Sequence, residues 1–330
     1  MSAPYPWQSG QWARLQQAQQ TGRLPHALLL AAPAGTGLRA FAERWGQARL
    51  CRAAHEQRPC GQCPACEQSA AGTHPDFVRL EPEERGKAIG VDAVRALTER
   101  VALTAGPQGK VALIDPADAM TLQAANALLK TLEEPPAGSV ILLLSHRASR
   151  LPATVRSRCQ VLTFGLPPRQ AALEWLQQAG VAEAPTWLAR AAGAPLAARE
   201  LATEGVDAEP AIDGLLATLE AGAAPPGLAA RVAQLPLQTS IPLLTTVVAD
   251  LVRLRVAAAA EQRLHHPARR EQLQRVAGRL DVRALFHYLD ELNRAVPGPS
   301  SGLRPDMQVQ GLLADAAALR RAAGREGRTD

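Results

Sequence analysis

The sequence predicts an α/β domain with a parallel sheet of five strands, followed by helical domains. Short apolar runs occur at residues 27–31, 77–80, 110–114, 139–144 and 161–164. Longer segments with helical spacing separate these runs. Strands that alternate with helices favour a parallel sheet covered by helices on both faces. After the stretch GLPP at 165–168 no run has a strand pattern, so the rest of the chain is predicted to be helical.

The clearest helical segments of the first half are VDAVRALTERVAL at 91–103 and TLQAANALLKTLEE at 121–134. Thr121 is the expected N-cap of the second segment, and Pro135 and Pro136 are expected to end it. Each helix would connect two parallel strands, which supports the predicted sheet.

Three domains are predicted: residues 1–165 with the sheet, a small helical domain at 166–205 and a larger helical domain at 206–330. The stretch TEGVDAEP at 203–210 is the predicted linker. The clearest helix of the last domain is DVRALFHYLDEL, which Asp281 is expected to cap. Its predicted apolar face consists of Val282, Leu285, Phe286, Leu289 and Leu292.

Composition limits the function only loosely. The 330 residues include 36 basic and 31 acidic side chains. This mild excess of positive charge suits an acidic partner such as nucleic acid, and it is equally typical of an ordinary solvated surface. No stretch approaches the roughly 18 apolar residues of a membrane helix. The N-terminus has no basic flank before an apolar core, so no signal peptide is expected and a cytoplasmic location is predicted.

The stretch APAGTGLRAF at 32–41 has the layout of a phosphate-binding P-loop, which requires G-x-x-x-x-G-K-[ST]. Gly35 and Gly37 are present, but Ala32 replaces the first glycine. Leu38 stands in the lysine position and Arg39 in the Ser/Thr position. The lysine neutralises phosphates and the hydroxyl binds Mg²⁺. We therefore expect no ATP hydrolysis here, while weak nucleotide binding by backbone amides stays open.

Four of the five cysteines form a C-x8-C-x2-C-x2-C pattern: Cys51, Cys60, Cys63 and Cys66. Four thiolates satisfy tetrahedral zinc with no open position, so a structural zinc site is predicted within an insertion at about residues 50–75. Disulfides, reactive thiols and His55 in place of one cysteine are the alternatives. The fifth cysteine, Cys159, is predicted to be a small core residue.

Three stretches resemble the clamp-loader subunits of bacterial DNA polymerase III, which belong to the AAA+ class. They are GRLPHALLLAAPAGTG at 22–37, ALIDPADAMTLQAANALLKTLEEPP at 112–136 and RLPATVRSRCQVLTF at 150–164. Within them, NALLKTLEEPP and the Ser-Arg-Cys triplet are the most specific. The resemblance implies an AAA+ domain, a helical lid domain and a helical collar domain that joins the subunits.

Within this family, zinc cysteines and Ser-Arg-Cys together with a broken P-loop are typical of the delta-prime type. The resemblance implies that Arg158, between Ser157 and Cys159, is an arginine finger acting in trans on a neighbour's ATP site. A surface or ion-paired arginine is the alternative. Asp115 is a Walker B remnant, followed by Pro116 where a catalytic Glu is expected. Leu196 stands where the family has a phosphate-sensing Arg.

The resemblance further implies a hetero-pentamer with delta and tau/gamma subunits, which loads the sliding clamp on primed DNA. Polymerase activity would follow only from membership of the holoenzyme. Two rival interpretations are an active tau/gamma-type ATPase and a stand-alone zinc-containing DNA-binding protein. Neither the strength of DNA and clamp contacts nor the role of residues 73–76 follows from the sequence.

Overall fold

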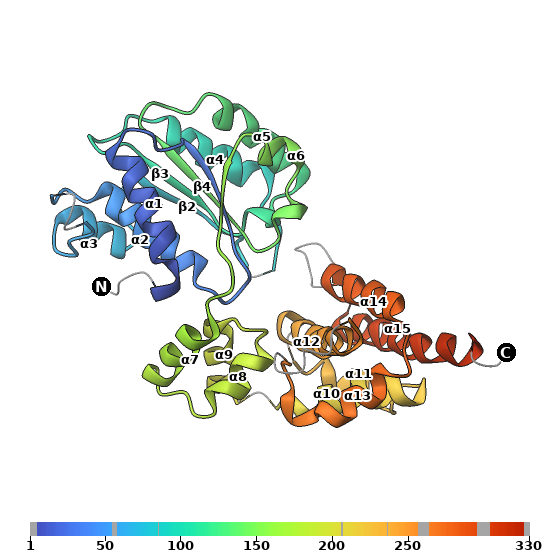
Figure 1. Cartoon of the computed structure of the whole chain (residues 1–330). Coiled ribbons are helices and arrows are strands. Elements are labelled where there is room, and N and C mark those ends of the chain that lie inside the picture. The colour runs from blue at the N-terminus through green and yellow to red at the C-terminus, as the bar shows by residue number, and fades with distance from the viewer. Residues whose placement is uncertain are drawn as a thin grey trace. The chain divides into compact units, whose positions relative to one another are not determined.

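The computed structural model describes residues 5–54, 58–84, 86–205, 207–235, 237–256, 264–295 and 304–326. The chain forms two compact units, and among the described residues the first of them ends at Ala171. The strands belong to the first unit, and the second unit is built from helices (Figure 1).

Parallel strands form the sheet of the first unit in the spatial order β2-β3-β4-β1-β5. Each prediction of a strand is confirmed, with boundaries that differ by at most one residue. Because the strands are parallel, their carboxyl ends meet at one edge of the sheet. The strands are β1 (Ala27–Ala31), β2 (Phe77–Leu80), β3 (Val111–Ile114), β4 (Val140–Ser145) and β5 (Gln160–Thr163).

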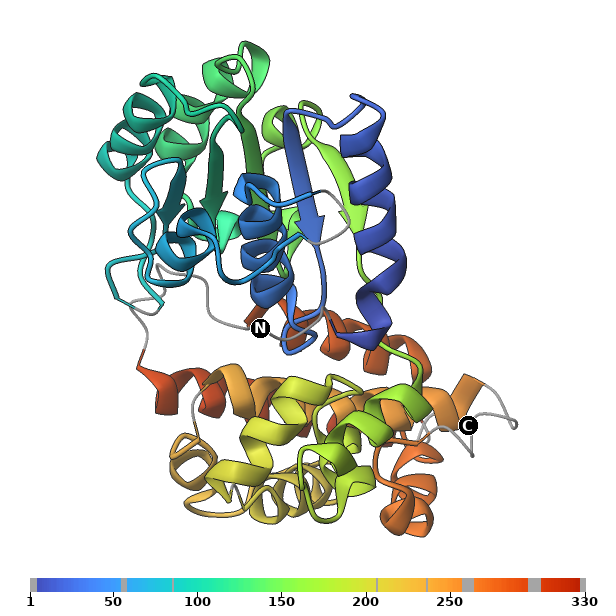
Figure 2. The same ribbon diagram turned by 90° about the vertical axis from the view of Figure 1, so that its left-hand side faces the viewer.

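Helices cover both faces of the sheet (Figure 2). Leu29 packs in one core cluster with Leu97 and Leu128, whereas its neighbour Leu28 packs in another cluster with Phe41. Successive side chains of a strand point to opposite faces, so β1 is buried on both. The predicted α/β fold class is confirmed. The covering helices are α4 (Val91–Ala102) and α5 (Leu122–Glu133) on one face, and α1 (Ser9–Gln20) and α2 (Leu38–Leu50) on the other.

The ends of α5 agree with the prediction. The Thr121 hydroxyl accepts a hydrogen bond from the backbone N–H of Ala124 at 3.1 Å, and the helix ends at Glu133, shortly before Pro135. The other helical elements of the first unit are short: η1 (Pro6–Gln8), α3 (Pro64–Ala70), η3 (Ala117–Ala119), η4 (Ala148–Arg150) and α6 (Ala153–Arg156).

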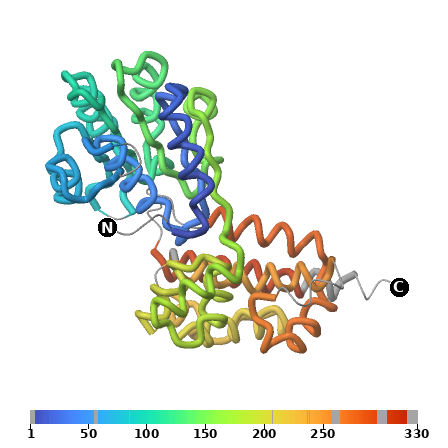
Figure 3. Tube along the Cα trace, turned by 60° about the vertical axis from the view of Figure 1, so that its left-hand side comes forward, coloured from blue at the N-terminus to red at the C-terminus, as the bar shows by residue number. Residues whose placement is uncertain are grey.

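The second unit contains no strand among its described residues, as predicted, and its trace winds through helices (Figure 3). Among the described helices, none combines the length and the apolar character that a membrane span requires. Helices α7–α9 enclose a small core of their own, and α10–α15 share a larger one. The predicted domain boundary between residues 205 and 206 stays a prediction. The elements are α7 (Arg169–Gln178), α8 (Ala184–Arg190), α9 (Pro195–Glu204), α10 (Glu209–Ala221), α11 (Leu228–Val232), α12 (Leu237–Val256), η6 (Pro267–Arg269), α13 (Arg270–Ala277), α14 (Val282–Ala295) and α15 (Pro305–Glu326).

Two expectations for this unit are wrong in detail. The predicted linker at 203–210 overlaps the end of α9 and the start of α10. In α14, Tyr288 is buried and Phe286 is 48% exposed, although Phe286 was assigned to the apolar face. Residues 285, 288 and 292 share one stripe of a 3.6-residue helix, whereas residue 286 lies about 100° away from residue 285.

Candidate functional site

The loop at residues 32–37 connects β1 to α2, which is the strand-loop-helix layout that the sequence predicts. Gly35 and Gly37 have φ angles of 73° and 89°, which residues with a side chain rarely adopt. Leu38, the first residue of α2, is 2% exposed and packs in the core with Phe41 and Leu30. The lysine position of the loop therefore holds a buried apolar side chain that cannot neutralise a phosphate.

The chain covers this loop with its own N-terminal segment. A Cβ atom at Gly37 would lie 2.3 Å from Cε2 of Tyr5, so the tyrosine ring packs directly on the loop backbone. The Trp7 indole N–H and the Gln8 side-chain amide both donate to the carbonyl of Thr36, at 3.0 and 3.1 Å. These contacts occupy the surface beside the turn that leads into α2.

Arg39, in the first turn of α2, pairs with two carboxylates at the edge of the sheet. Its Nε lies 2.6 Å from Oδ2 of Asp115, and its Nη1 donates to Oε1 of Glu81 at 2.6 Å. Asp115 is only 4% exposed, and this burial raises the pKa of its carboxyl while the charge of Arg39 opposes the shift. The guanidinium thus supplies the positive charge that a buried carboxylate requires.

The sheet explains why these carboxylates meet. Strands β2 and β3 pair with Leu80 opposite Ile114, so the next residues, Glu81 and Asp115, lie side by side. Sequence reasoning singled out Asp115 and Arg39 but missed Glu81. Glu81 directly follows the predicted strand at 77–80, and this position was the available signal. It identifies Glu81 as a neighbour of Asp115 only when the two strands are known to be adjacent in the sheet.

Two further residues at this edge hold the loop in place. The Ser145 hydroxyl at the end of β4 donates to Oδ1 of Asp118 at 2.7 Å, and the His146 backbone N–H donates to the same oxygen at 3.3 Å. Nδ1 of His146 lies 3.0 Å from the carbonyl of Ala32 at the start of the loop. Asp118 was not singled out from the sequence.

Arg158 lies between α6 and β5, with its side chain 34% exposed. Its Nε donates to Oε1 of Glu133 at 2.5 Å, and its Nη2 forms an ion pair with the same oxygen. Its Nη1 donates to the carbonyl of Thr154 at 2.9 Å, to which the Ser157 hydroxyl also donates. Arg158 is thus partly exposed and has an acidic partner, Glu133, that sequence reasoning missed. Its role as a finger in trans stays a prediction.

Cys159 follows directly and is half-buried against the core of the first unit. Burial raises the pKa of its thiol to about 11. The thiol is therefore neutral at physiological pH, which suits packing rather than reactivity.

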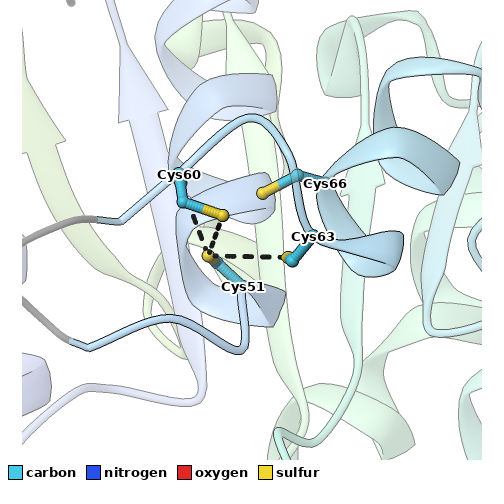
Figure 4. A group of neighbouring side chains, drawn as sticks. All are labelled: Cys51, Cys60, Cys63 and Cys66. Carbon is cyan, nitrogen blue, oxygen red and sulfur yellow. Dashed lines mark hydrogen bonds between the residues drawn. The ribbon is translucent and has the colours of Figure 1, made fainter.

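The four predicted ligand cysteines come together (Figure 4). Their Sγ atoms all lie within 4.8 Å of one another, and Cys51 Sγ lies 3.6 Å from Cys60 Sγ and 3.9 Å from Cys63 Sγ. Four thiolates bound tetrahedrally at about 2.3 Å would be about 3.8 Å apart. The cluster could therefore hold a metal ion. His55, the alternative ligand, lies outside the described residues.

Local structure positions these thiols. Cys51 directly follows α2, Cys63 is the N-cap of α3, and Cys66 lies in the first turn of α3. Burial and the neighbouring cysteines raise the pKa of Cys66 to about 12. Burial also opposes ionisation of Cys63, but hydrogen bonds from the backbone of Arg52 and Cys66 outweigh it and lower its pKa to about 6. A cation among the sulfurs would offset both the burial and the neighbouring cysteines that raise the pKa of Cys66.

The sequence offered no explanation for the stretch from Thr73 to Asp76. In the structure this stretch precedes β2 and contacts the residues that precede β3. Oδ1 of Asp76 pairs with the buried ammonium of Lys110 at 3.3 Å, and Oδ2 accepts from the Gly106 N–H at 3.2 Å. Nδ1 of His74 accepts from the Asp76 N–H at 3.0 Å. The stretch therefore has a structural role in aligning β2 with β3.

Parts of the chain are similar in sequence to known proteins. Residues 7–167, nearly half of the chain, match the family described as DNA polymerase III, delta subunit. The chain is 48% identical over 211 residues to the DNA polymerase III subunit delta' of Pseudomonas aeruginosa, and 42% identical over 175 residues to that of Escherichia coli. Over these residues the chain is similar to the delta' subunits of DNA polymerase III.

These matches are partial. They cover 62% of this chain and 63% of the Pseudomonas protein, and 53% of this chain and 52% of the Escherichia protein. A solved structure, a DNA polymerase III gamma-subunit-related protein of Thermotoga maritima, is 16% identical with a TM-score of 0.40, and the match covers 93% of this chain and 99% of that one. The loop, the cysteine cluster and Arg158 all lie within residues 7–167, the part of the chain that matches the family model.

The Arg39 ion pair can be tested by its effect on stability. Replacing Arg39 with Met should lower the free energy of unfolding by about 1–2 kcal/mol, because Asp115 stays buried without a cation. Adding Asp115→Asn should recover part of this loss, since the charge is then gone. Chemical denaturation measures both.

Arg95→Met is the matched control, because Arg95 pairs with Asp92 on an exposed helix surface. Removing such an exposed pair should change stability by less than about 0.5 kcal/mol. An equal effect of Arg39→Met and Arg95→Met would show that the Arg39 contacts do not stabilise the sheet edge.

Proposed function

We propose that this chain is a clamp-loader subunit that does not hydrolyse ATP and supplies Arg158 to the ATP site of a neighbouring tau/gamma subunit. The observation that carries the proposal is the ion pair of Arg39 with Asp115. It places a side-chain cation beside the carboxylate that would help to hold Mg²⁺ in an active P-loop enzyme. The partial similarity to DNA polymerase III delta' subunits supports this role.

The residues of the loop do not fit Mg-ATP. A metal ion near Asp115 would have to displace the guanidinium of Arg39, and Leu38 offers no charge to the phosphates. Tyr5 packs on Gly37, where the loop backbone would face a ligand. Each feature argues against the rival interpretation of an active motor subunit.

Arg158 has the properties that a finger in trans requires. Guanidinium is planar and permanently charged, and it matches phosphate oxygens. The side chain is partly exposed and lies on a short turn between α6 and β5. A subunit that keeps the fold can dock beside related subunits and present this arginine, even after its own site has lost its chemistry.

The partners follow from this role. They would be delta and tau/gamma subunits in a hetero-pentamer, with the sliding clamp and primed DNA engaged through the complex in the cytoplasm. A DNA polymerase activity would belong to the holoenzyme and not to this chain. The rival interpretation of a stand-alone DNA-binding protein would require salt-dependent DNA binding by the isolated chain.

We propose that the four-cysteine cluster holds a structural Zn²⁺. Four sulfur donors fill the tetrahedral coordination of zinc and leave no position for water or substrate. The cluster joins the end of α2 to the start of α3, so the ion would stabilise the insertion between α2 and β2.

The missing nucleotide chemistry predicts no Mg-ATP binding by the isolated chain at millimolar nucleotide. Leu38→Lys combined with Arg39→Ser restores the two motif positions and should make binding detectable by titration calorimetry. Arg95→Met serves as the control for removing an arginine. Tight Mg-ATP binding by the unaltered chain would contradict the proposal.

The finger hypothesis predicts a specific loss in a reconstituted loader. Arg158→Ala should slow hydrolysis at the adjoining motor site by about 10³-fold or more, which corresponds to roughly 4 kcal/mol. Rapid-quench measurement of the ATP hydrolysed in the first turnover gives this rate. Arg156→Ala is the neighbouring control. Unchanged hydrolysis with intact assembly would refute the role of Arg158.

The zinc hypothesis predicts about one zinc ion for each purified chain, because the cluster offers one closed tetrahedral site. Cys60→Ser should lose the ion and lower the thermal unfolding temperature, whereas Cys159→Ser should keep the ion. Elemental analysis and thermal unfolding measure both effects. A folded chain without zinc and with four reactive thiols would contradict the assignment.

A further inference from the structure

The guanidinium of Arg158 is held from one side. Its Nε and Nη2 both contact Oε1 of Glu133, and its Nη1 donates to the Thr154 carbonyl. A guanidinium has five N–H donors, and these contacts engage one on each nitrogen. One N–H therefore remains on each terminal nitrogen, which is the number that a bidentate contact with phosphate oxygens uses.

The groups that hold Arg158 are fixed by the core. Glu133 is the last residue of α5, next to Leu132, which is 1% exposed. Thr154 belongs to α6, next to the fully buried Val155. Leu132 and Val155 belong to the same core cluster, so the carboxylate and the carbonyl stand on elements that pack together.

We propose that Glu133 is a positioning residue that orients Arg158 for contact with a phosphate group of a neighbouring subunit. This inference rests on the proposed role of Arg158 in trans. A long arginine side chain at a surface samples many rotamers, and the two fixed acceptors reduce that freedom before the subunits meet. Glu133 itself touches no reacting atom.

A purely structural role for this pair is a weak alternative, because both partners are solvent-exposed, at 34% and 49% of their side chains. Exposed ion pairs contribute little to stability. Removing the Glu133 carboxylate should therefore leave folding and assembly intact, so that a change in hydrolysis reports on the orientation of Arg158.

The test compares single-turnover ATP hydrolysis by reconstituted loaders that contain the full chain or its variants. Glu133→Ala should lower the rate constant at the adjoining site by about tenfold, since misplacing a reacting group by about 1 Å costs up to about 10²-fold. Glu133→Gln keeps an acceptor oxygen and should lose less. The KM for ATP should stay the same, because the motor binds the nucleotide.

Glu134→Ala is the matched control, since it removes the same charge one residue away, at an exposed position just after α5. Glu133→Ala is also made in the Arg158→Ala background. A positioning residue acts only through Arg158, so the double variant should hydrolyse ATP at the rate of Arg158→Ala alone.

Each other outcome has a distinct meaning. If Arg158→Ala has no effect, the proposed function fails, and this inference fails with it. If Arg158→Ala slows hydrolysis but Glu133→Ala does not, only the positioning role fails. Faster hydrolysis by Glu133→Ala would mean that the carboxylate restrains the arginine, which overturns the inference. A further loss in the Arg158→Ala background would mean a structural role.

Discussion

A buried carboxylate at the end of β3 determines the chemistry of the sheet edge. Asp115 is 4% exposed, and a carboxylate in this environment requires a cation nearby. In a P-loop enzyme a bound metal ion can supply that charge, whereas in this chain the guanidinium of Arg39 supplies it. The same interaction that stabilises the edge occupies the place beside Asp115 that a metal ion would need, so under the proposed function stability and the loss of nucleotide chemistry would have one cause.

The contacts of the loop follow from this constraint. With an internal cation in place, Leu38 can pack in the core and Tyr5 can pack on Gly37, since neither has to leave space for phosphates. The backbone of this edge has the strand-loop-helix layout of a phosphate site. Its side chains instead fill the space with contacts inside the chain. The proposed finger requires that this edge and its sheet can dock beside related subunits.

Two ion pairs in the first unit therefore differ in kind. Arg39 pairs with the buried carboxylate of Asp115, and its positive charge is needed there to compensate the negative charge of that carboxylate. Arg158 pairs with Glu133 at the surface and keeps donors for another partner. Burial separates the two arginines. The first is committed to its own fold, and under the proposed function the second would exchange or extend its contacts with a neighbouring subunit.

The sequence by itself determined the strands, their parallel arrangement and the cysteine cluster. These depend on local patterns. Short continuous apolar runs are typical of strands in a buried parallel sheet, and the spacing of the cysteines lets their thiols bind one metal ion. It also identified Leu38 and Arg39 as departures from a P-loop, because that motif is contiguous along the chain.

Only the tertiary structure decided which distant residues meet. Glu81 lies beside Asp115 because β2 neighbours β3, and Glu133 reaches Arg158 because α5 packs against α6. Neither pair has a local pattern, since the partners are separated by tens of residues. Likewise Tyr288 is buried in α14 and Phe286 is not. The core contacts one stripe of this helix, and sequence periodicity alone does not determine which residues lie at the border of that stripe.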